Sequence, residues 1–262
     1  MRIKPLFSGL KKSPRNFLRA LIVLALWGAF PIPAAWAREP SPKTLARVFK
    51  SLVSLETLAG QVFGEKQAFL DEATGQVVVA ARIRPVALTR AGAGMIITSD
   101  GVIAANHHTV SQAGRIRVRL QSGVEAEARH LHTVPGTDIA FLKIDLPYKL
   151  EPILFADSEA VKKGQVVFTV GNSEELKGDL IRGKITGLGV PDNKKEGEPS
   201  ITQLQTNFEL HYGDSGAPVL DSRGGVLGMI VARPAITDRI SLALPAAMIV
   251  KGYKAYQKSL KD

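Results

Sequence analysis

The sequence predicts an all-β fold, either a barrel or a sandwich, with one helix at each end of the folded chain. Beyond about residue 76, short apolar runs with a period of two are separated by turn residues, a pattern typical of strands. About 225 residues follow the N-terminal leader, which is enough to bury a sizeable core. Cysteine is absent, so this core must stabilise the fold without disulfides or thiolate metal sites.

Residues 1–37 have the layout of an export signal. Six lysines and arginines and no acidic residue occupy residues 1–19, and the apolar run Ala20–Phe30 follows them. This run is about half the roughly 20 residues that a membrane-spanning helix needs, so an uncleaved membrane anchor is the less favoured alternative. Ala35 and Ala37 form a small-x-small site, and cleavage is expected after Ala37. The folded chain is therefore expected to be periplasmic or secreted, without stable membrane insertion.

The charge distribution argues against a nucleic-acid partner. The formal charge is +10, and the six cations of the leader account for all of it except +4 on residues 38–262. No run of lysine or arginine is interleaved with aromatic residues in the way that single-strand binding requires. A polyanion is therefore not expected as a partner.

The first predicted element is an amphipathic helix in an N-terminal helical segment, residues 38–75. Apolar residues recur at helical spacing from Ser41 to about Leu58, and Ser41 followed by Pro42 is typical of a cap and first turn. The first half of the β-structure is expected to follow, over residues 76–158.

Within this first half, a hairpin and two strands are the clearest signals. Residues 95–97 and 102–103 are joined through a turn in which Gly101 can take a positive φ. In Arg115–Leu120 the apolar residues alternate strictly with arginine, which predicts one buried face and one solvated arginine face. The run Ile139–Ile144 is nearly continuous in apolar residues, as in a strand enclosed by a barrel.

The second half is expected over residues 159–262. A connector at residues 151–164, rich in turn and charged residues, separates it from the first half. The apolar run Val166–Val170 is one of its strands, and Ala246–Ser259 ends the chain with a helical pattern.

The segment Gly213–Pro218 carries the strongest chemical signal. It places Ser215 on a glycine-bearing turn between strand-like runs, where a nucleophilic hydroxyl would be exposed. The backbone N–H groups of Gly213 and Ser215 are expected to form an oxyanion hole, each worth on the order of 3 kcal/mol to the barrier. By itself, a Gly-Asp-Ser-Gly run is also typical of a surface turn, so the assignment needs a base and an orienting acid.

His108 and Asp138 are the predicted base and orienting acid. Serine is a weak nucleophile at its own pKa, and histidine has the side-chain pKa nearest neutrality. His108 follows a strand-like run, and Asp138 opens the apolar strand near residue 139, where a carboxylate would fix the imidazole tautomer and stabilise the imidazolium. His107 is the alternative base, but adjacent side chains point in different directions, so only one of the two can serve.

Together with their flanking segments, these residues resemble the HtrA/Deg family of trypsin-like serine proteases. The chain order His, Asp, Ser is that of chymotrypsin and differs from the subtilisin and α/β-hydrolase orders. The resemblance covers about residues 76–250. It is carried by Gly94–Ile97, Asn106–Val110, Thr137–Ile144, Phe155–Ser158, Val170–Asn172, Gly213–Pro218 and Leu242–Pro245.

The resemblance implies a chymotrypsin-like double β-barrel with the site between the barrels, no cofactor, and endoproteolysis of unfolded or damaged envelope proteins. It also implies homotrimers held by N-terminal segments, although residues 38–75 do not visibly match the family. Many members carry a PDZ domain after the protease; the chain stops at Asp262, so regulation through such a domain is not expected. A holdase that keeps the protease fold without turnover is the alternative function.

The family usually has Asn at the positions of His107 and Asp214 and Gly at that of Ala217, and none of these departures removes a catalytic group.

Glu209 and a pair of histidines carry weaker hypotheses. Glu209 lies six residues before Ser215, at the base of the primary pocket in trypsin-like enzymes, where an acid would favour Lys or Arg before the cut bond. An exposed loop carboxylate is the alternative interpretation of Glu209.

On a regular strand His130 and His132 would share a face and, together with His107, would suggest a zinc site. No further ligand stands at diagnostic spacing, so no metal is expected.

Overall fold

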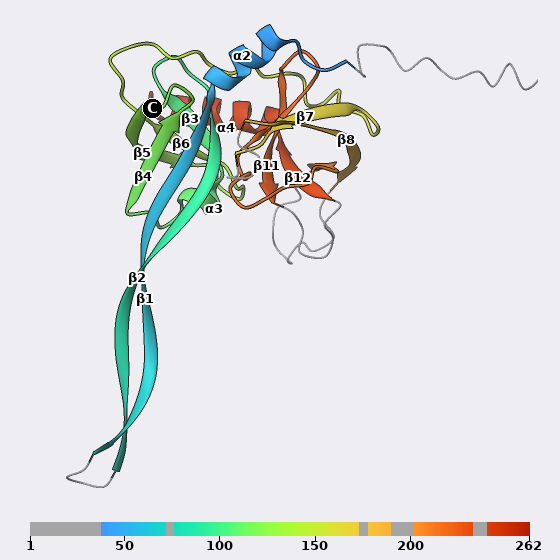
Figure 1. The fold of residues 1–262 in the computed structure, drawn as a ribbon. Helices are drawn as coiled ribbons and strands as arrows, with labels where there is room; N and C mark the ends of the chain where they lie inside the picture. Colours follow the sequence, from blue (N-terminus) through green and yellow to red (C-terminus); the bar gives the residue numbers. More distant parts are fainter. Residues whose placement is uncertain (1–37, 72–75, 173–177, 190–201, 233–239) are drawn as a thin grey trace, which may run out of the picture. The chain divides into compact units, whose positions relative to one another are not determined.

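The computed structural model describes residues 38–71, 76–172, 178–189, 202–232 and 240–262. The predicted leader, with its cleavage site after Ala37, lies outside the described residues. In the described part of the chain the strands form two closed antiparallel barrels of six strands each, so the predicted double β-barrel is confirmed (Figure 1). Among the described residues, no helix is long and apolar enough to cross a membrane.

The first barrel consists of strands β1 to β6, at Leu52–Asp71, Gln76–Ile96, Val102–Ala105, Arg115–Leu120, Glu125–Thr133 and Ala140–Lys143. Their spatial order is β1-β2-β3-β6-β5-β4, and β4 pairs with β1 to close the barrel. The second barrel consists of β7 to β12, at Val166–Val170, Leu180–Gly189, Gln203–Thr206, Pro218–Leu220, Val226–Ala232 and Ser241–Pro245. Its order is β10-β11-β12-β9-β8-β7, closed between β10 and β7. The helices are α2 at Pro42–Lys50, α3 at His107–Val110 and α4 at Ala246–Ser259.

The predicted alternation of β4 is confirmed. Ile116, Val118 and Leu120 are buried in the first barrel. The intervening arginines form ion pairs with glutamates on neighbouring strands, namely Arg115 with Glu127, Arg117 with Glu56 and Arg119 with Glu125. Exposed pairs of this kind contribute about 1 kcal/mol or less, so the arginine face is a solvated strand surface.

The predicted turn at Gly101 is also confirmed. Gly101 connects β2 to β3 with a φ of +99°. A Cβ at this position would lie 2.4 Å from the carbonyl oxygen of Ile144. The turn therefore needs glycine both for its backbone conformation and for space.

The N-terminal helix is shorter than predicted. Its cap is as expected, since Ser41 Oγ accepts a hydrogen bond from the Thr44 N–H at 3.2 Å. The helix ends at Lys50 instead of near Leu58, and β1 begins at Leu52. The helical interpretation of residues 38–75 is therefore wrong for the larger part of that segment.

The start of β1 is buried on both faces, which explains the error. Leu52 packs in one core cluster, whereas Val53 and Leu55 pack in another, inside the first barrel. A strand buried on both faces gives a nearly continuous apolar run that periodicity alone cannot distinguish from a buried helix. The first barrel consequently begins at residue 52 and not near residue 76.

Strands β1 and β2 extend well beyond the barrel. They stay paired along their whole lengths, from Leu52 to Asp71 on β1. In contrast, β4 follows β1 only as far as Leu58, and β3 pairs only with the last residues of β2. Residues 59–71 and 76–88 therefore form a two-stranded projection, here called the arm (Figure 1). Within the described residues no third strand pairs with the arm, so both of its edges present backbone groups outside any sheet.

Each barrel is contacted by a helix that adjoins the other barrel in the sequence. Helix α2 precedes the first barrel, yet Arg47 Nη2 donates to the carbonyl of Arg223 in the second barrel at 3.3 Å. Helix α4, which has the bounds predicted for it, follows the second barrel, yet the ring of Tyr253 lies 5.3 Å from that of Phe141 on β6. One buried cluster contains residues of both barrels and both helices, including Val48 of α2. The barrels therefore share part of their core.

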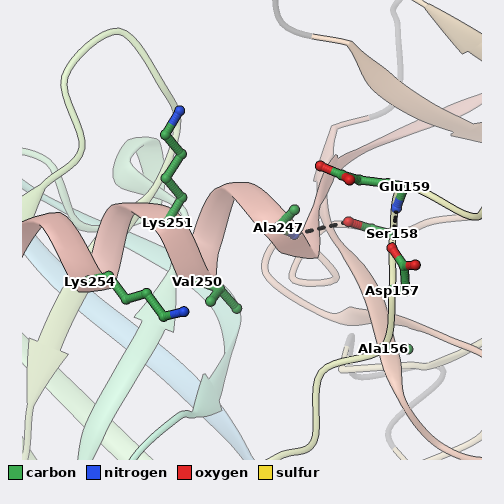
Figure 2. A pocket seen from close by; sticks show the side chains of 8 residues that line it. All are labelled: Ala156, Asp157, Ser158, Glu159, Ala247, Val250, Lys251 and Lys254. Atoms are coloured by element: carbon green, nitrogen blue, oxygen red, sulfur yellow. Dashed lines mark hydrogen bonds between the residues drawn. The ribbon is translucent and has the colours of Figure 1, made fainter.

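The connector between the barrels caps α4. Ser158 Oγ accepts a hydrogen bond from the Ala247 N–H at 3.0 Å, whereas Pro245, the residue at the N-cap, supplies no side-chain cap. Figure 2 shows this contact beside a hollow in the protein. The charged residues that line the hollow are Asp157 and Glu159 on the connector and Lys251 and Lys254 on the helix.

Replacing Ser158 with alanine is expected to lower the free energy of unfolding by about 1 kcal/mol, because the Ala247 N–H loses its acceptor. Urea unfolding followed by circular dichroism measures this change. Ser259→Ala, at an exposed position near the other end of α4, is the matched control and should change the free energy by less than about 0.5 kcal/mol. Equal effects of the two substitutions would show that the Ser158 contact does not stabilise the helix.

Candidate active site

Strand register brings His108 and Asp138 together. Strands β3 and β6 are antiparallel with Ala105 opposite Ala140, so the residues after β3 lie beside those before β6. His108 follows β3 on the short helix α3, and Asp138 lies two residues before β6. Asp138 Oδ2 lies 2.6 Å from His108 Nδ1, and Asp138 Oδ1 accepts a hydrogen bond from the His108 backbone N–H at 2.8 Å. One carboxylate thus fixes both the ring and the backbone of the histidine.

The backbone around this pair is also held by hydrogen bonds. The Asp138 carbonyl accepts hydrogen bonds from Asn106 Nδ2 and from the His107 N–H, both at 3.2 Å. Arg90 Nη1 donates to the His108 carbonyl at 2.8 Å. Because a carboxylate has only acceptor atoms, His108 Nδ1 carries the proton, and Nε2 of the neutral ring remains an acceptor. This is the tautomer that a general base requires.

The turn that carries Ser215 is fixed against the first barrel. The Ser215 carbonyl accepts a hydrogen bond from the Ala93 N–H of β2 at 2.7 Å. Gly216 has a φ of +92°, and a Cβ there would lie 2.0 Å from the Ala93 carbonyl oxygen, so only glycine fits. Asp214 is buried, and its carboxylate accepts two backbone N–H groups at 2.8 Å each. Ser215 is therefore held at the point where the two barrels meet.

The predicted oxyanion donors are the backbone N–H groups of Gly213 and Ser215. Gly213 is buried and has a φ of +104°. Among the described residues, neither the Gly213 N–H nor the Ser215 N–H donates a hydrogen bond to the protein, whereas the Asp214 N–H between them donates to the His211 carbonyl at 3.2 Å. Two such N–H groups beside a nucleophile can stabilise an oxyanion.

The hydroxyl of Ser215 is turned toward a backbone carbonyl. Ser215 Oγ donates to the carbonyl of Val231 on β11 at 3.1 Å, and in the described structure no hydrogen bond joins it to His108. The segment that carries His108 and the turn that carries Ser215 are nevertheless close together. A Cβ on Gly92 would lie 2.7 Å from Thr109 Cγ2 and 3.2 Å from the Ser215 carbonyl oxygen. The residue after His108 and the backbone of Ser215 thus both lie beside Gly92.

Two residues that contact the turn were given no role by the sequence pattern. Val231 contributes only a backbone carbonyl, which no residue type reveals. Asn172 contacts the turn through both its side chain and its backbone. An amide side chain two residues after the buried apolar strand β7 is the signal that could have marked Asn172 as a positioning candidate.

Of the three histidines considered for zinc, two share a hydrogen-bond partner and the third stacks on a tyrosine. Strand β5 has a register shift between His130 and His132, so the alternation that would place both on one face is broken. His130 Nε2 and His107 Nδ1 lie 2.9 and 3.1 Å from Thr133 Oγ1, whereas the His132 ring stacks on Tyr256 at 5.1 Å. Partial desolvation, with smaller effects from the two neighbouring histidines, lowers the pKa of His130. Within the part of the chain that the structure describes, no group of three or more His, Cys, Asp or Glu side chains is arranged to hold a metal.

Glu209 lies in the loop after β9, and its side chain is exposed. A carboxylate at the base of a charged specificity pocket is enclosed by protein, so this placement matches the alternative of an exposed loop carboxylate. Phe208 and Leu210, the residues on either side of Glu209, are buried.

Replacing Glu209 with glutamine is therefore expected to leave the residue preference before the cut bond unchanged. The measurement is mass spectrometry of the fragments that the parent and the variant produce from one unfolded protein. If the parent cut after Lys and Arg and Glu209→Gln lost that preference, Glu209 would be the acid of the pocket.

Two six-stranded barrels, with a paired His and Asp on the first and a Ser on a glycine-bearing turn of the second, have the architecture of the chymotrypsin-like serine peptidases. Comparison with known proteins agrees with this class. Residues 92–229 match the trypsin-like peptidase domain, and the chain belongs to the trypsin-like peptidase family.

The relatives of the chain include HtrA and DegP proteases, which confirms the predicted resemblance. The chain is 31% identical to the serine protease HTRA1A of Danio rerio over 160 residues. This alignment covers 60% of the chain and 33% of that protein. It is 32% identical over 175 residues to a probable periplasmic serine endoprotease DegP-like of Bartonella henselae, covering 63% of the chain and 32% of that protein. The chain thus spans about a third of the length of these curated relatives. Its fold is similar to that of the HtrA-type protease AlgW with tripeptide, with a TM-score of 0.62 and 22% identity over 81% of the chain and 62% of AlgW.

Proposed function

We propose that the chain is a serine endopeptidase in which Ser215 is the nucleophile, His108 the general base and Asp138 the orienting acid. The observation that carries the proposal is the double contact of Asp138 with His108, because it holds the imidazole in the tautomer that accepts a proton at Nε2. The N–H groups of Gly213 and Ser215, without internal acceptors among the described residues, support a role as oxyanion donors. Membership of the trypsin-like peptidase family supports peptide-bond hydrolysis as the reaction. This reaction needs no cofactor.

The proposed reaction begins with a rotation of the Ser215 side chain. The hydroxyl leaves the Val231 carbonyl and donates to His108 Nε2, and Oγ attacks the substrate carbonyl carbon as His108 takes the proton. The Gly213 and Ser215 N–H groups stabilise the negative carbonyl oxygen, and Asp138 stabilises the imidazolium. His108 then gives the proton to the leaving amine. Water, deprotonated by the same histidine, attacks the acyl-enzyme and releases the second product.

The proposed substrates are unfolded or damaged polypeptides, and the proposed location is the periplasm or the cell exterior. The DegP-like relative of Bartonella henselae is described as a periplasmic endoprotease, which supports this location. The export-signal layout of residues 1–37 supports it independently. A homotrimer is the proposed assembly, and sedimentation equilibrium would give its subunit number.

The test is incubation of the purified full chain with an unfolded protein and, separately, with a fluorophosphonate. Fragments of the unfolded protein should accumulate, and peptide mapping should find the phosphonyl group on Ser215. A chain that neither cleaves nor reacts, yet keeps the unfolded protein from aggregating, would be a holdase on a protease fold, and the proposal would then be wrong.

A further inference from the structure

Asn172 makes hydrogen bonds with two strands of the first barrel and with the turn that carries Ser215. Its Nδ2 donates to the Gly92 carbonyl of β2 and to the Gly213 carbonyl, at 2.9 Å each. Its Oδ1 accepts a hydrogen bond from Ser54 Oγ on β1 at 2.6 Å. Its backbone N–H donates to Asp214 Oδ1 at 2.8 Å. Both amide hydrogens and the amide oxygen are engaged, so the side chain is held in one orientation.

Two of these contacts restrain the peptide groups around the proposed oxyanion hole. Gly213 can adopt backbone conformations that are closed to other residues, so its own chain does little to fix the direction of its N–H. The hydrogen bond from Asn172 to the Gly213 carbonyl fixes the plane of the peptide that joins Gly213 to Asp214. The bond to Asp214 Oδ1 restrains the residue whose carbonyl precedes the Ser215 N–H. Asn172 therefore restrains, from one position, the peptide that lies between the two peptides that carry the donors.

We propose that Asn172 is a positioning residue for the oxyanion hole and that Ser54, at the base of the arm, orients it. This inference rests on the proposed function of Ser215. Ser54 lies opposite Ala93 in the register of β1 and β2, and the Ala93 N–H is the group that binds the Ser215 carbonyl. The two strands that extend into the arm therefore contact the turn twice, directly through Ala93 and indirectly through Asn172.

Asn172→Asp distinguishes a positioning role from a purely structural one. The variant keeps the side-chain size and the acceptor for Ser54 Oγ, but it places a carboxylate oxygen against the carbonyls of Gly92 and Gly213, which repel it. For the full chain acting on a fluorogenic peptide, kcat is expected to fall by at least about tenfold, short of the roughly 10²- to 10³-fold loss caused by removing an oxyanion donor. The KM should change little, because the substrate-binding surface is intact.

Two serine variants complete the comparison. Ser54→Ala removes only the hydroxyl that orients the amide, so its loss in kcat should be smaller than that of Asn172→Asp, again without a matching change in KM. Ser241→Ala is the matched control, because it removes a buried hydroxyl that is hydrogen-bonded to Thr206 in the second barrel. It should leave kcat unchanged. If Asn172→Asp does not fold, the kcat of Ser54→Ala is compared with that of Ser241→Ala, and this comparison tests the same inference.

A second measurement does not depend on activity. Hydrogen exchange of the peptide covering residues 207–218 is expected to be faster in Asn172→Asp than in Ser241→Ala, because the turn loses its restraint. A parent that reacts with fluorophosphonate, beside an Asn172→Asp variant with parental kcat and parental exchange, would overturn the inference. If the parent does not react, the proposed function fails, while faster exchange in Asn172→Asp would still support a positioning role for Asn172 in the turn.

Discussion

Replacing Ser215 with alanine is expected to lower kcat on an unfolded protein by about 10⁶-fold, because without Oγ no acyl-enzyme forms. The loss should be confined to the chemical step. In the described structure the hydroxyl is bonded to the carbonyl of Val231, so its removal takes away one hydrogen bond, worth about 1 kcal/mol of stability. Initial rates of fragment formation, with urea unfolding of the same preparations, measure both effects.

Ser241→Ala is the control for this comparison as well. It also removes one hydroxyl from the second barrel, and it should retain the parental kcat. The nucleophile would lie elsewhere if the Ser215→Ala variant kept a kcat within about a hundredfold of the parent, since residual catalysis without a nucleophile is far smaller.

Replacing Asp138 with asparagine is expected to lower kcat by about 10⁴-fold with little change in fold. The asparagine oxygen can still accept the backbone N–H of His108, which preserves the position of α3. Its NH₂ group, however, would face His108 Nδ1 and donate to it, which forces the ring proton onto Nε2. A ring in that tautomer cannot accept the proton of Ser215.

The matched control is Asp145→Asn, which neutralises an exposed aspartate that pairs with Lys143 on the same barrel. Its kcat should equal that of the parent, because exposed ion pairs contribute little and Asp145 does not contact His108. A pH–rate profile of both variants separates the orientation of His108 by a carboxylate from the effect of a negative charge elsewhere on the same barrel. Equal profiles and equal rates in Asp138→Asn and Asp145→Asn would show that Asp138 does not orient the base.

The elements with one buried face could be predicted from the sequence. Strand β4 shows the period of two because the first barrel covers only one of its faces, and α4 shows the period of a helix for the same reason. The proximity of His108 and Asp138 could also be anticipated, because each stands beside a strand signal and these two strands pair. Their catalytic roles, and those of Ser215 and Gly213, stay predictions until the variants are measured.

Other features could not be predicted because they depend on tertiary contacts. The change from α2 to β1 falls inside a stretch whose apolar residues keep a helical spacing, although Leu52 and Val53 are buried in different clusters. The arm is built from strands several times longer than most, which no local pattern of short runs indicates. The hydrogen bond of the Ser215 hydroxyl to a carbonyl, and not to His108, depends on how β11 lies beside the turn.

The exchange of helices between the barrels has a consequence for the order in which the molecule folds. Arg47 on α2 finds its acceptor 176 positions later in the chain, and α4 covers a barrel whose own strands ended long before it. Contacts of such sequence separation form late, because the intervening loops must close before the contacts stabilise them. A chain that is still being synthesised therefore contains the strands of the first barrel before the helix whose Tyr253 packs against Phe141. The proposed catalytic site combines residues of both barrels, so it would form only after both barrels have folded.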